Sequence, residues 1–441
     1  MTNPNAFAKD PSFWVRLGWG ALVALITAIG TLLFVILMNL GLNLVWGWLD
    51  LSEMEAFSGT WPILVIMVTV GLVVGVIHHF TDTEEANVFE AVQKGYLDPK
   101  PVPAALLISL ISMIGGYSVG PEVPSGMWAG GFATWLSERR KMPDELRASN
   151  VSSGIVSAYG GLFTSPFAFV VMRLELAHAQ NPLFFGTIVV ATVAATVGFG
   201  FFYAVAGDEY AELLRLLDLP SYTLELWHLL AAIAFGLVGV LLALFYGITL
   251  GTLKRLVAPL ENRPVVRGVG AGLLLGLLGM ALPLTMFLGS EGLVIVTETG
   301  ATMGVALVLA LVFGKILATA GAISTGFIGG PIFPLFFVGG AAGTAINLIF
   351  PDVPLGLAVG CTMAALTGAA LPAPFMIAIV VLLVTGIPAT EGIPVLLAAI
   401  VAHGITFGFG LIPHPSAAQR HPSSATEGAS PGTDAQPRSD G

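Results

Sequence analysis

The sequence predicts an all-α, polytopic membrane protein, and three features of its composition support that fold class. Only 10% of the 441 residues are charged, 56% are hydrophobic and the mean hydropathy is +0.89, whereas a soluble chain carries about 25% charged residues. Apolar runs long enough to cross a bilayer recur from residue 13 to about 410. The 54 glycines and 28 prolines indicate broken helices, which membrane interiors tolerate where protein surrounds the freed backbone. A water-soluble enzyme is therefore not expected.

The chain begins with a polar segment, residues 1–12, followed by an apolar run from Phe13 to Leu49. This run is far too long for the apolar core of a signal peptide, so it predicts a retained, tilted transmembrane helix. Further apolar segments follow at 61–80, 102–119, 123–136, 149–177, 183–206, 224–257, 267–288, 302–323, 332–350, 354–370, 373–386 and 391–412. Several are short or interrupted by Gly and Pro, as expected of helices that stop near mid-membrane.

The order of these segments suggests an internal repeat. We interpret residues 13–206 as a first membrane repeat and 224–412 as a second, separated by an outward loop at 207–223. The stretch 413–441 is rich in Ser, Pro, Ala and Gly and has no apolar period, which predicts a disordered tail.

The orientation in the membrane follows from Lys and Arg, which concentrate in cytoplasmic loops. Two basic loops are predicted to be cytoplasmic, and their cations are Arg139, Arg140, Lys141, Arg147, Lys254, Arg255, Arg263 and Arg267. The acidic stretches 207–223 and 289–300 are predicted to be outward loops. We expect a multi-pass protein of the plasma membrane with both termini in the cytoplasm.

Each half contains one Gly/Pro-rich break that opens into an apolar helix. The first reads Gly-Gly-Tyr-Ser-Val-Gly-Pro-Glu-Val-Pro-Ser-Gly over 115–126, and the second reads Ser-Thr-Gly-Phe-Ile-Gly-Gly-Pro-Ile-Phe-Pro over 324–334. Corresponding breaks in two repeats indicate a binding site at the membrane midplane. A helix N-terminus presents unpaired N–H groups and partial positive charge, so two that meet can hold an anion. Ordinary Gly/Pro kinks are the alternative.

Glu122 favours the binding site over ordinary kinks. Its carboxylate is flanked by Pro121 and Pro124 at the opening of an apolar helix, where burial would be costly unless it faced a pore or a site. Because a carboxylate at a helix N-terminus can occupy the place of an anion, we predict that Glu122 is a competitor or gate. The alternative is an acid that complements the helix dipole at a wet membrane surface.

Other polar residues carry weaker signals. Arg173 and Glu175 are interpreted as solvent-facing charges at a helix end, and the isolated Lys315 can snorkel or pair with a helix C-terminus. The adjacent His78 and His79 precede an acidic run, but adjacent histidines diverge on a helix, so a polar membrane boundary is favoured over a metal site.

Several functional classes are disfavoured by what the sequence lacks. The single cysteine, Cys361, excludes a disulfide framework and a multi-cysteine metal site. No phosphate-binding loop is present, which argues against an ATP-driven pump, and no basic run is suited to nucleic acid. No cofactor and no metal are expected.

Residues 314–339 contain Gly-Lys-Ile-Leu-Ala-Thr-Ala and, further on, Gly-Gly-Pro-Ile-Phe-Pro. They resemble the Lys-x-x-x-Thr stretch and the following helix start of the CLC chloride channel and transporter family. Gly-Pro-Glu-Val-Pro at 120–124 resembles that family's Gly-Arg/Lys-Glu-Gly-Pro, which places Glu122 at the gating glutamate. Residues 160–175 resemble the stretch that precedes the dimer-interface helices, and 360–374 resemble its counterpart in the second half.

The resemblance covers nearly all of residues 13–410 and implies a CLC-type inverted repeat whose broken and re-entrant helices meet at a midplane ion site. It also implies a homodimer with one pore per subunit in a lipid bilayer, transporting a small inorganic anion, for which chloride is the expected ion. In that arrangement Glu122 would be the gate. The backbone positions expected to hold the ion are Gly120, Pro121, Val123, Gly330, Pro331, Ile332 and Phe333.

The chain departs from the family pattern at several positions. Where the family has a Gly-Ser-Gly-Ile-Pro anion loop, residues 82–87 read Asp-Thr-Glu-Glu-Ala-Asn, and their carboxylates would repel an anion. Leu176 stands where coupled exchangers carry an inner proton-carrying glutamate. No tyrosine follows Tyr246 to supply the pore tyrosine, and His414 is only a positional match. Ile332 stands where the family usually has Phe.

These departures favour passive, channel-like anion conduction over proton coupling. Three alternatives stay open from the sequence. The first is proton-coupled antiport with Glu175 as the substitute acid. The second is a cation-linked carrier, motivated by Glu84, Glu85 and Glu122, and the third is a membrane scaffold without transport, against which a buried Glu122 argues.

Overall fold

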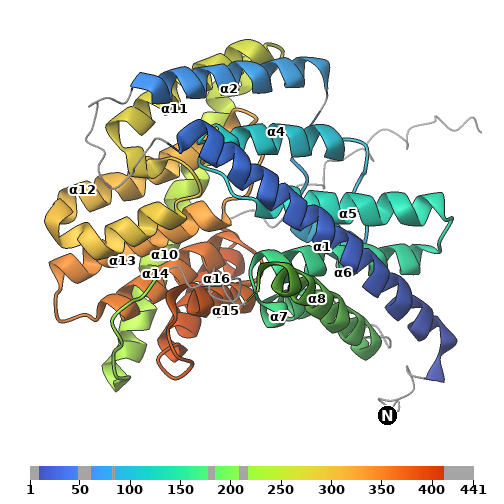
Figure 1. Cartoon of the computed structure of the whole chain (residues 1–441). Helices are drawn as coiled ribbons and strands as arrows, with labels where there is room; N and C mark the ends of the chain where they lie inside the picture. The colour runs from blue at the N-terminus through green and yellow to red at the C-terminus, as the bar shows by residue number, and fades with distance from the viewer. Residues whose placement is uncertain are drawn as a thin grey trace, which may run out of the picture.

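The computed structural model describes residues 9–47, 61–81, 83, 85–176, 184–207 and 217–411, and within them the chain is built almost entirely of helices (Figure 1). Seven of the helices in these ranges are long and apolar enough to cross a membrane. The only β-type pairing among the described residues is an isolated bridge between Gly120 and Gly330. The protein is thus an all-α, multi-pass membrane protein, as the sequence predicts.

The first half is made of eight helices in the described ranges. They are α1 (Pro11–Trp46), α2 (Trp61–Phe80), α3 (Val88–Lys94), α4 (Val102–Ile114), α5 (Glu122–Arg139), α6 (Asp144–Leu162), α7 (Pro166–Glu175) and α8 (Phe184–Ala206). Asp10 begins α1 by accepting a hydrogen bond from the backbone N–H of Ser12 at 2.9 Å, which is the usual way an acidic residue caps a helix N-terminus.

The second half continues with seven α-helices and two short 3₁₀ turns. They are α10 (Leu226–Val257), η2 (Ala258–Leu260), α11 (Pro264–Ala281), η3 (Pro283–Thr285), α12 (Ser290–Ser324), α13 (Ile332–Ile349), α14 (Leu355–Ala370), α15 (Pro374–Thr385) and α16 (Ile393–Gly408). Within α12 the backbone breaks at Gly304, whose φ of 77° is a left-handed value that glycine adopts without steric cost.

Two sequence-based element boundaries are corrected by the structure. The apolar segment 149–177 is two helices, α6 and α7, because the Phe163–Thr164–Ser165 turn separates them and Ser165 caps the second helix. The stretch 289–300, predicted to be an outward loop from its acidic residues, forms the first turns of α12 instead. The predicted tail at 413–441, the polar residues 1–8 and most of the loop at 207–223 lie outside the described residues.

Helices α2 and α11 run side by side in opposite directions across one edge of the molecule (Figure 1). Their backbones touch: a Cβ atom added at Gly75 would lie 2.7 Å from the carbonyl oxygen of Pro264, and one added at Gly272 would lie 2.6 Å from that of Met67. Small residues at such contacts let membrane helices pack closely where lipid supplies no hydrophobic drive.

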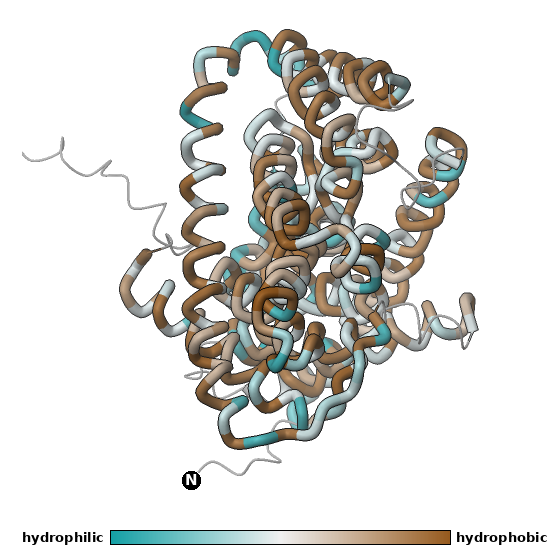
Figure 2. The backbone as a smooth tube through the Cα atoms, turned by 90° about the vertical axis from the view of Figure 1, so that its left-hand side faces the viewer, coloured by the Kyte–Doolittle hydropathy of each residue, from teal (hydrophilic) through white to brown (hydrophobic). Residues whose placement is uncertain are grey.

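The outer surface of the helices is apolar, as lipid exposure requires. In Figure 2 the helical tubes are mostly coloured as hydrophobic, and the hydrophilic segments lie mainly at helix ends and connections. Large apolar side chains such as Leu44 of α1 and Leu226 of α10 are 86% and 85% exposed. By contrast, α13 and α14 are almost wholly buried by protein, so the helix that opens from the second break lies in the core.

Candidate functional site

The two Gly/Pro-rich breaks meet in the interior of the protein. Gly120 and Gly330 exchange backbone hydrogen bonds, each N–H donating to the other's carbonyl oxygen at 2.8 Å. Beside this bridge the rings of Tyr117 and Phe327 stack with centroids 3.7 Å apart. Each pair is separated by 210 residues, which is also the separation of Glu122 and Ile332, the first residues of α5 and α13. Corresponding positions of the two breaks therefore face one another.

The helices that open from the breaks begin without a side-chain cap. Pro121 precedes α5 and Pro331 precedes α13, and neither offers a hydrogen-bonding side chain. Elsewhere, Asn87 caps α3 and Ser165 caps α7, as is common at helix N-termini. The first N–H groups of α5 and α13 are consequently left for another acceptor.

The carboxylate of Glu122 takes one of these N–H groups. Its Oε1 accepts a hydrogen bond from the backbone N–H of Ile332 at 2.6 Å, and its side chain is only 1% exposed. Its Oε2 has no hydrogen-bond partner among the described residues. Any Cβ atom at Gly330 would collide with this carboxyl group, so glycine is required there for the close approach.

The set of available donors is smaller than the sequence predicts. The N–H groups of Gly120 and Gly330 already donate to each other's carbonyl oxygens in the bridge, and Pro121 and Pro331 have no backbone N–H group. Among the predicted positions, Val123, Ile332 and Phe333 keep the N–H groups of first helical turns. Within the two predicted stretches, the glycines and prolines therefore shape the breaks, while the N–H groups of Val123, Ile332 and Phe333 stay available; that these groups hold the ion stays a prediction.

Glu122 faces a cavity of about 360 Å³ that sequence reasoning did not foresee. Val123, Pro331 and Ile332 line it beside Glu122. Its further wall includes four polar residues from distant segments: Glu85, Tyr159, Tyr246 and Lys254. No local motif could have identified Tyr159 and Tyr246 as its lining, because only the packing of α6 and α10 brings them there.

Glu175 has a different environment. Its Oε1 accepts from the N–H of Phe375 at 2.7 Å and its Oε2 accepts from the N–H of Met376 at 3.0 Å, so it caps the N-terminus of α15. It lines neither the cavity at Glu122 nor the one that adjoins it. Its neighbour Leu176 is buried. Glu175 thus lies at a helix end and is partly exposed, as expected, but its carboxylate also caps α15, a contact that the sequence did not indicate.

Lys315 and His78 are both held by backbone carbonyl groups. The Nζ of the fully buried Lys315 donates to the carbonyl oxygens of Thr285, Met286 and Phe287 at 3.2, 2.8 and 2.8 Å. The Nε2 of His78 donates to the carbonyl oxygen of Gly326 at 2.8 Å. Within the described ranges, no group of three His, Cys, Asp or Glu side chains is placed to hold a metal ion.

Comparison with known proteins identifies the family. A family model described as voltage gated chloride channel matches residues 66–406. The chain belongs to this family. Because the family consists of ion channels and transporters, the match supports CLC-type anion transport, and it agrees with the resemblance found in the sequence.

Relatives and solved structures agree with this assignment. Proteins named "Putative ion-transport protein YfeO" from Salmonella typhimurium and Salmonella choleraesuis are each 27% identical, covering 72% and 70% of this chain and 77% and 74% of theirs. The structure of a slow cyanobacterial Cl⁻/H⁺ antiporter superposes with a TM-score of 0.73 at 18% identity, covering 90% of this chain and 95% of that one. A CLC-type fluoride/proton antiporter gives the same TM-score and identity, with 90% and 96% covered. At these identities the structures establish the shared fold.

The positions where this chain departs from the CLC pattern lie partly in the described ranges. In the stretch that replaces the anion loop, Asp82 and Glu84 lie outside the described residues, whereas Glu85 lines the cavity at Glu122. His414, the positional match to the pore tyrosine, also lies outside them. Tyr246, which comes far earlier in the chain, places a tyrosine beside the same cavity.

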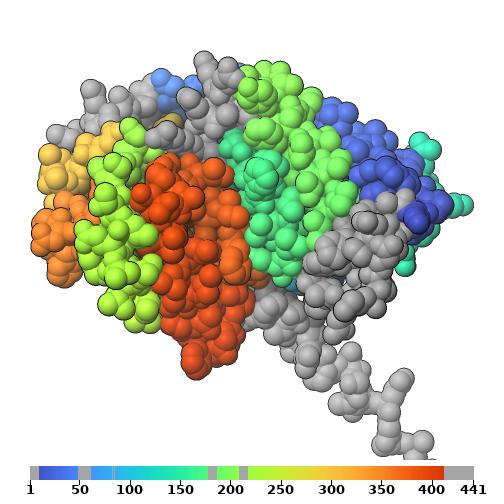
Figure 3. Space-filling model, turned by 90° about the horizontal axis from the view of Figure 1, so that it is seen from below, coloured from blue at the N-terminus to red at the C-terminus, as the bar shows by residue number. Residues whose placement is uncertain are grey.

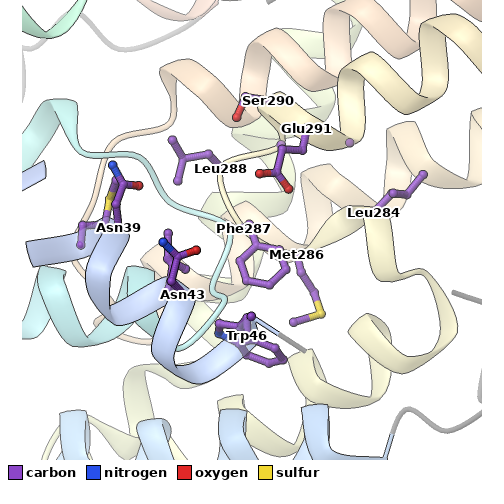
Figure 4. A pocket seen from close by; sticks show the side chains of 14 residues that line it. Asn39, Asn43, Trp46, Leu284, Met286, Phe287, Leu288, Ser290 and Glu291 are labelled. Carbon is purple, nitrogen blue, oxygen red and sulfur yellow. The ribbon is translucent and has the colours of Figure 1, made fainter. Parts of the chain in front are cut away.

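A separate cavity of about 400 Å³ lies between the C-terminal end of α1 and the segment that joins α11 to α12 (Figure 4). Asn39, Asn43 and Trp46 project into it from α1, and Glu291 does so from the start of α12. None of the residues at the two breaks lines it. This cavity is therefore distinct from the one at Glu122.

Proposed function

We propose that this chain is a passive, chloride-conducting CLC pore in which the carboxylate of Glu122 is the gate. The observation that carries the proposal is the hydrogen bond from the Ile332 N–H to Glu122 Oε1. A carboxylate there occupies the position that an anion would take at an uncapped helix N-terminus. Chloride and the carboxylate then compete for the same donor.

Protonation provides the means of release. An ionised carboxylate is a strong acceptor for a helix N-terminal N–H, whereas a neutral carboxylic acid is a much weaker one. Oε2 of Glu122 has no hydrogen-bond partner among the described residues, so the carboxylate is held mainly through Oε1, which accepts from the N–H of Ile332. Acid conditions should therefore free the N–H of Ile332 for the anion and increase conduction.

Passive conduction is supported by the residues near the end of α7. Proton-coupled transport needs an ionisable group in the membrane that carries the proton to the gate. Leu176, at the position expected for it, has an apolar side chain. Both carboxylate oxygens of the adjacent Glu175 accept hydrogen bonds from N–H groups at the N-terminus of α15. Glu175 does not line the cavity at Glu122.

Chloride and proton fluxes recorded together from reconstituted liposomes test this function. We expect a chloride gradient to drive chloride flux with no accompanying proton movement. Absence of any anion flux would overturn the proposal. Chloride-driven proton uptake that Glu175→Gln abolishes, with chloride flux intact, would show that Glu175 carries the proton and that passive conduction is wrong.

Proton-coupled antiport is the second candidate, and one observation favours it. Glu85 and Glu122 line the same cavity, so an acid other than Glu175 is placed to exchange protons with the gate. The same assay distinguishes the two candidates, because antiport requires proton uptake that disappears in Glu85→Gln and persists in Glu175→Gln.

We further propose that the protein is a homodimer in the plasma membrane with both termini in the cytoplasm. The supporting surface involves α7, α8 and the C-terminal helices, which lie side by side in Figure 3. Phe167 of α7 is 77% exposed and Phe375 of α15 is 45% exposed. Self-association of such a face would bury these side chains against their own copies.

Crosslinking through single cysteines in α8 tests the dimer. In a background in which the buried Cys361 is replaced by Ala, Val189→Cys should give a crosslinked dimer and no higher ladder, because Val189 is partly exposed on α8. Val65→Cys on the exposed side of α2 is the matched control and should stay uncrosslinked. A monomer in mild detergent at every concentration would contradict the proposal.

A further inference from the structure

Two cavities adjoin at Glu85 and Lys254. The first, of about 360 Å³, extends from Glu122 past the two tyrosines to these residues. The second, of about 380 Å³, continues from them toward Glu261 and Arg267 at the end of the α2–α11 pair. Because both cavities are lined by Glu85 and Lys254, these two side chains lie where the two cavities meet, between Glu122 and this mouth.

Glu85 and Lys254 face the same space without forming an ion pair. Other acids of the described chain do pair: Arg147 lies 2.9 Å from Asp144, and Lys94 pairs with Glu90. No oxygen of Glu85 lies within ion-pairing distance of Lys254, although the two charges interact electrostatically. Both side chains line the two cavities where these meet.

We propose that the ammonium group of Lys254 is a binding subsite for a small monovalent anion, and that the carboxylate of Glu85 is its protonatable competitor. An ammonium group without a protein partner, facing a cavity that ends at an anion site, supplies the charge such an ion needs. When Glu85 is ionised it cancels this charge and repels the anion. When Glu85 is protonated, Lys254 is free to hold it. The proposal rests on the anion transport proposed above and adds a regulated subsite to the same path.

The other charged and titratable groups around Glu85 are arranged on both sides of it. Toward the mouth they are His78 of α2, Glu261 after η2 and Arg267 of α11, and toward the ion site they are Glu122 of α5, Tyr159 of α6 and Tyr246 of α10. The Nε of Arg267 has no hydrogen-bond partner among the described residues. This second cation, at the outer part of the mouth, adds to the attraction of anions toward Lys254.

The sign of the pH effect follows from the position of Glu85. It lies in the connection between α2 and α3, outside the spanning helices, with its side chain exposed to the cavities but surrounded by protein on their walls. This burial raises the pKa of Glu85 to about 7, while Lys254 lowers it and Glu122 raises it. The neutral form therefore gains population as the pH on the Lys254 side falls below neutrality, and anion occupancy rises with it.

Planar bilayer recordings with the pH changed on one side at a time test the competitor. Acidifying the Lys254 side from about pH 8 to about pH 6 should raise the wild-type anion current several-fold, because this range spans the titration of Glu85. Glu85→Gln should conduct at the high level throughout and lose this dependence, and the comparison is made in the Glu122→Gln background, because Glu122 lines the same cavity and would otherwise also titrate. Glu261→Gln, which removes an acid from the mouth only, is the matched control and should respond as the wild type. A Glu85→Gln variant that keeps the full dependence would overturn the proposal.

Saturation of the current with chloride tests the subsite. Lys254→Gln should raise the half-saturating chloride concentration on the mouth side by about tenfold, the loss expected for one charge-assisted contact. Arg255→Gln is the control, because Arg255 is the next residue on α10 but lines a different cavity. An unchanged half-saturating concentration in Lys254→Gln would overturn the proposal.

Calorimetric titration of the detergent-solubilised protein with sodium chloride separates this inference from the transport function. Wild-type protein should bind chloride several-fold more tightly at about pH 6 than at about pH 8, and Glu85→Gln should bind equally at both. If the protein binds chloride with this pH dependence but carries no anion flux, the transport function fails and the subsite stands. Flux without this pH-dependent binding would overturn the subsite alone.

Discussion

Glu122 and Glu175 are two membrane-embedded acids that accept hydrogen bonds at the N-terminus of another helix, yet they do so in opposite ways. Glu175 uses both carboxylate oxygens on two successive N–H groups of α15. Glu122 uses Oε1 on the N–H of Ile332 in α13, its carboxylate also interacts with its own N–H and that of Phe333, and its Oε2 has no hydrogen-bond partner among the described residues. The first arrangement resembles a helix cap, and the second leaves part of the charge unsatisfied.

The difference supports a structural role for Glu175 and is consistent with the gating role proposed for Glu122. A buried charged oxygen without a partner costs about 1–3 kcal/mol or more. Movement of the Glu122 carboxylate out of this position would therefore remove this cost. A cavity beside it gives it somewhere to go. Glu175 has both oxygens satisfied and does not line the cavity at Glu122, so its protonation or movement would cost stability.

The largest expected effect is on the pH dependence of conduction in Glu122→Gln. The substitution keeps the size of the side chain and removes its negative charge, which mimics a protonated gate. A single titrating gate changes its protonated fraction by at most about tenfold per pH unit. We expect wild-type chloride flux to fall as the pH rises, and Glu122→Gln to stay conducting with most of that dependence gone.

This measurement is made on liposomes in the Glu85→Gln background, so that the titration of Glu85 in the same cavity does not contribute. Glu175→Gln is the matched control, since it neutralises the other helix-capping acid, and it should keep the wild-type pH dependence. Unchanged flux with unchanged pH dependence in Glu122→Gln would remove Glu122 from the gate and with it the contrast between the two acids.

The sequence predicted the part of the site that local chemistry determines. Glycine and proline mark where α5 and α13 must begin, and an acid between two prolines at such a start stands out without any tertiary information. The breaks at 115–126 and 324–334 could therefore be paired before their contact was known. The bridge between Gly120 and Gly330, which removes their N–H groups from the donor set, depends on tertiary contact and could not be read from either break.

The rest of the site comes from long-range packing. Tyr159, Tyr246 and Lys254 reach one cavity only because α6 and α10 pack around the two breaks, and nothing in their local sequence marks them. The same holds for Glu175, whose acceptor role depends on α15 some 200 residues later in the chain. The sequence does not predict the short helix α3 for a different reason. Asn87 followed three residues later by Glu90 is a helix-start signal, but the helix has only seven residues and so no sustained apolar period.

The smaller expected effect is on stability and concerns Glu175. Glu175→Gln keeps one carbonyl oxygen for an N–H of α15 but replaces the other oxygen with an NH₂ group, which cannot accept from the second. Hydrogen bonds to a charged group contribute about 1.5–3 kcal/mol each, and the loss of the carboxylate's interaction with the helix dipole adds about 0.3–1 kcal/mol. We expect the free energy of unfolding to fall by about 1–3 kcal/mol, which in a chain of this size lowers Tm by only a few degrees.

Thermal unfolding of the detergent-solubilised protein measures this effect, and Glu138→Gln is its control. Glu138 is an exposed acid near the end of α5 that forms no ion pair within the described residues, so its neutralisation should leave Tm within about a degree of the wild type, as for most surface substitutions. Glu122→Gln should not fall below Glu175→Gln in Tm, because it removes an unsatisfied charge along with its single hydrogen bond. If Glu175→Gln melted with the wild type while Glu122→Gln lost several degrees, the roles assigned to the two acids would have to be exchanged. In that case the bidentate contact at α15 would contribute nothing to stability, and the single contact at α13 would be the structural one.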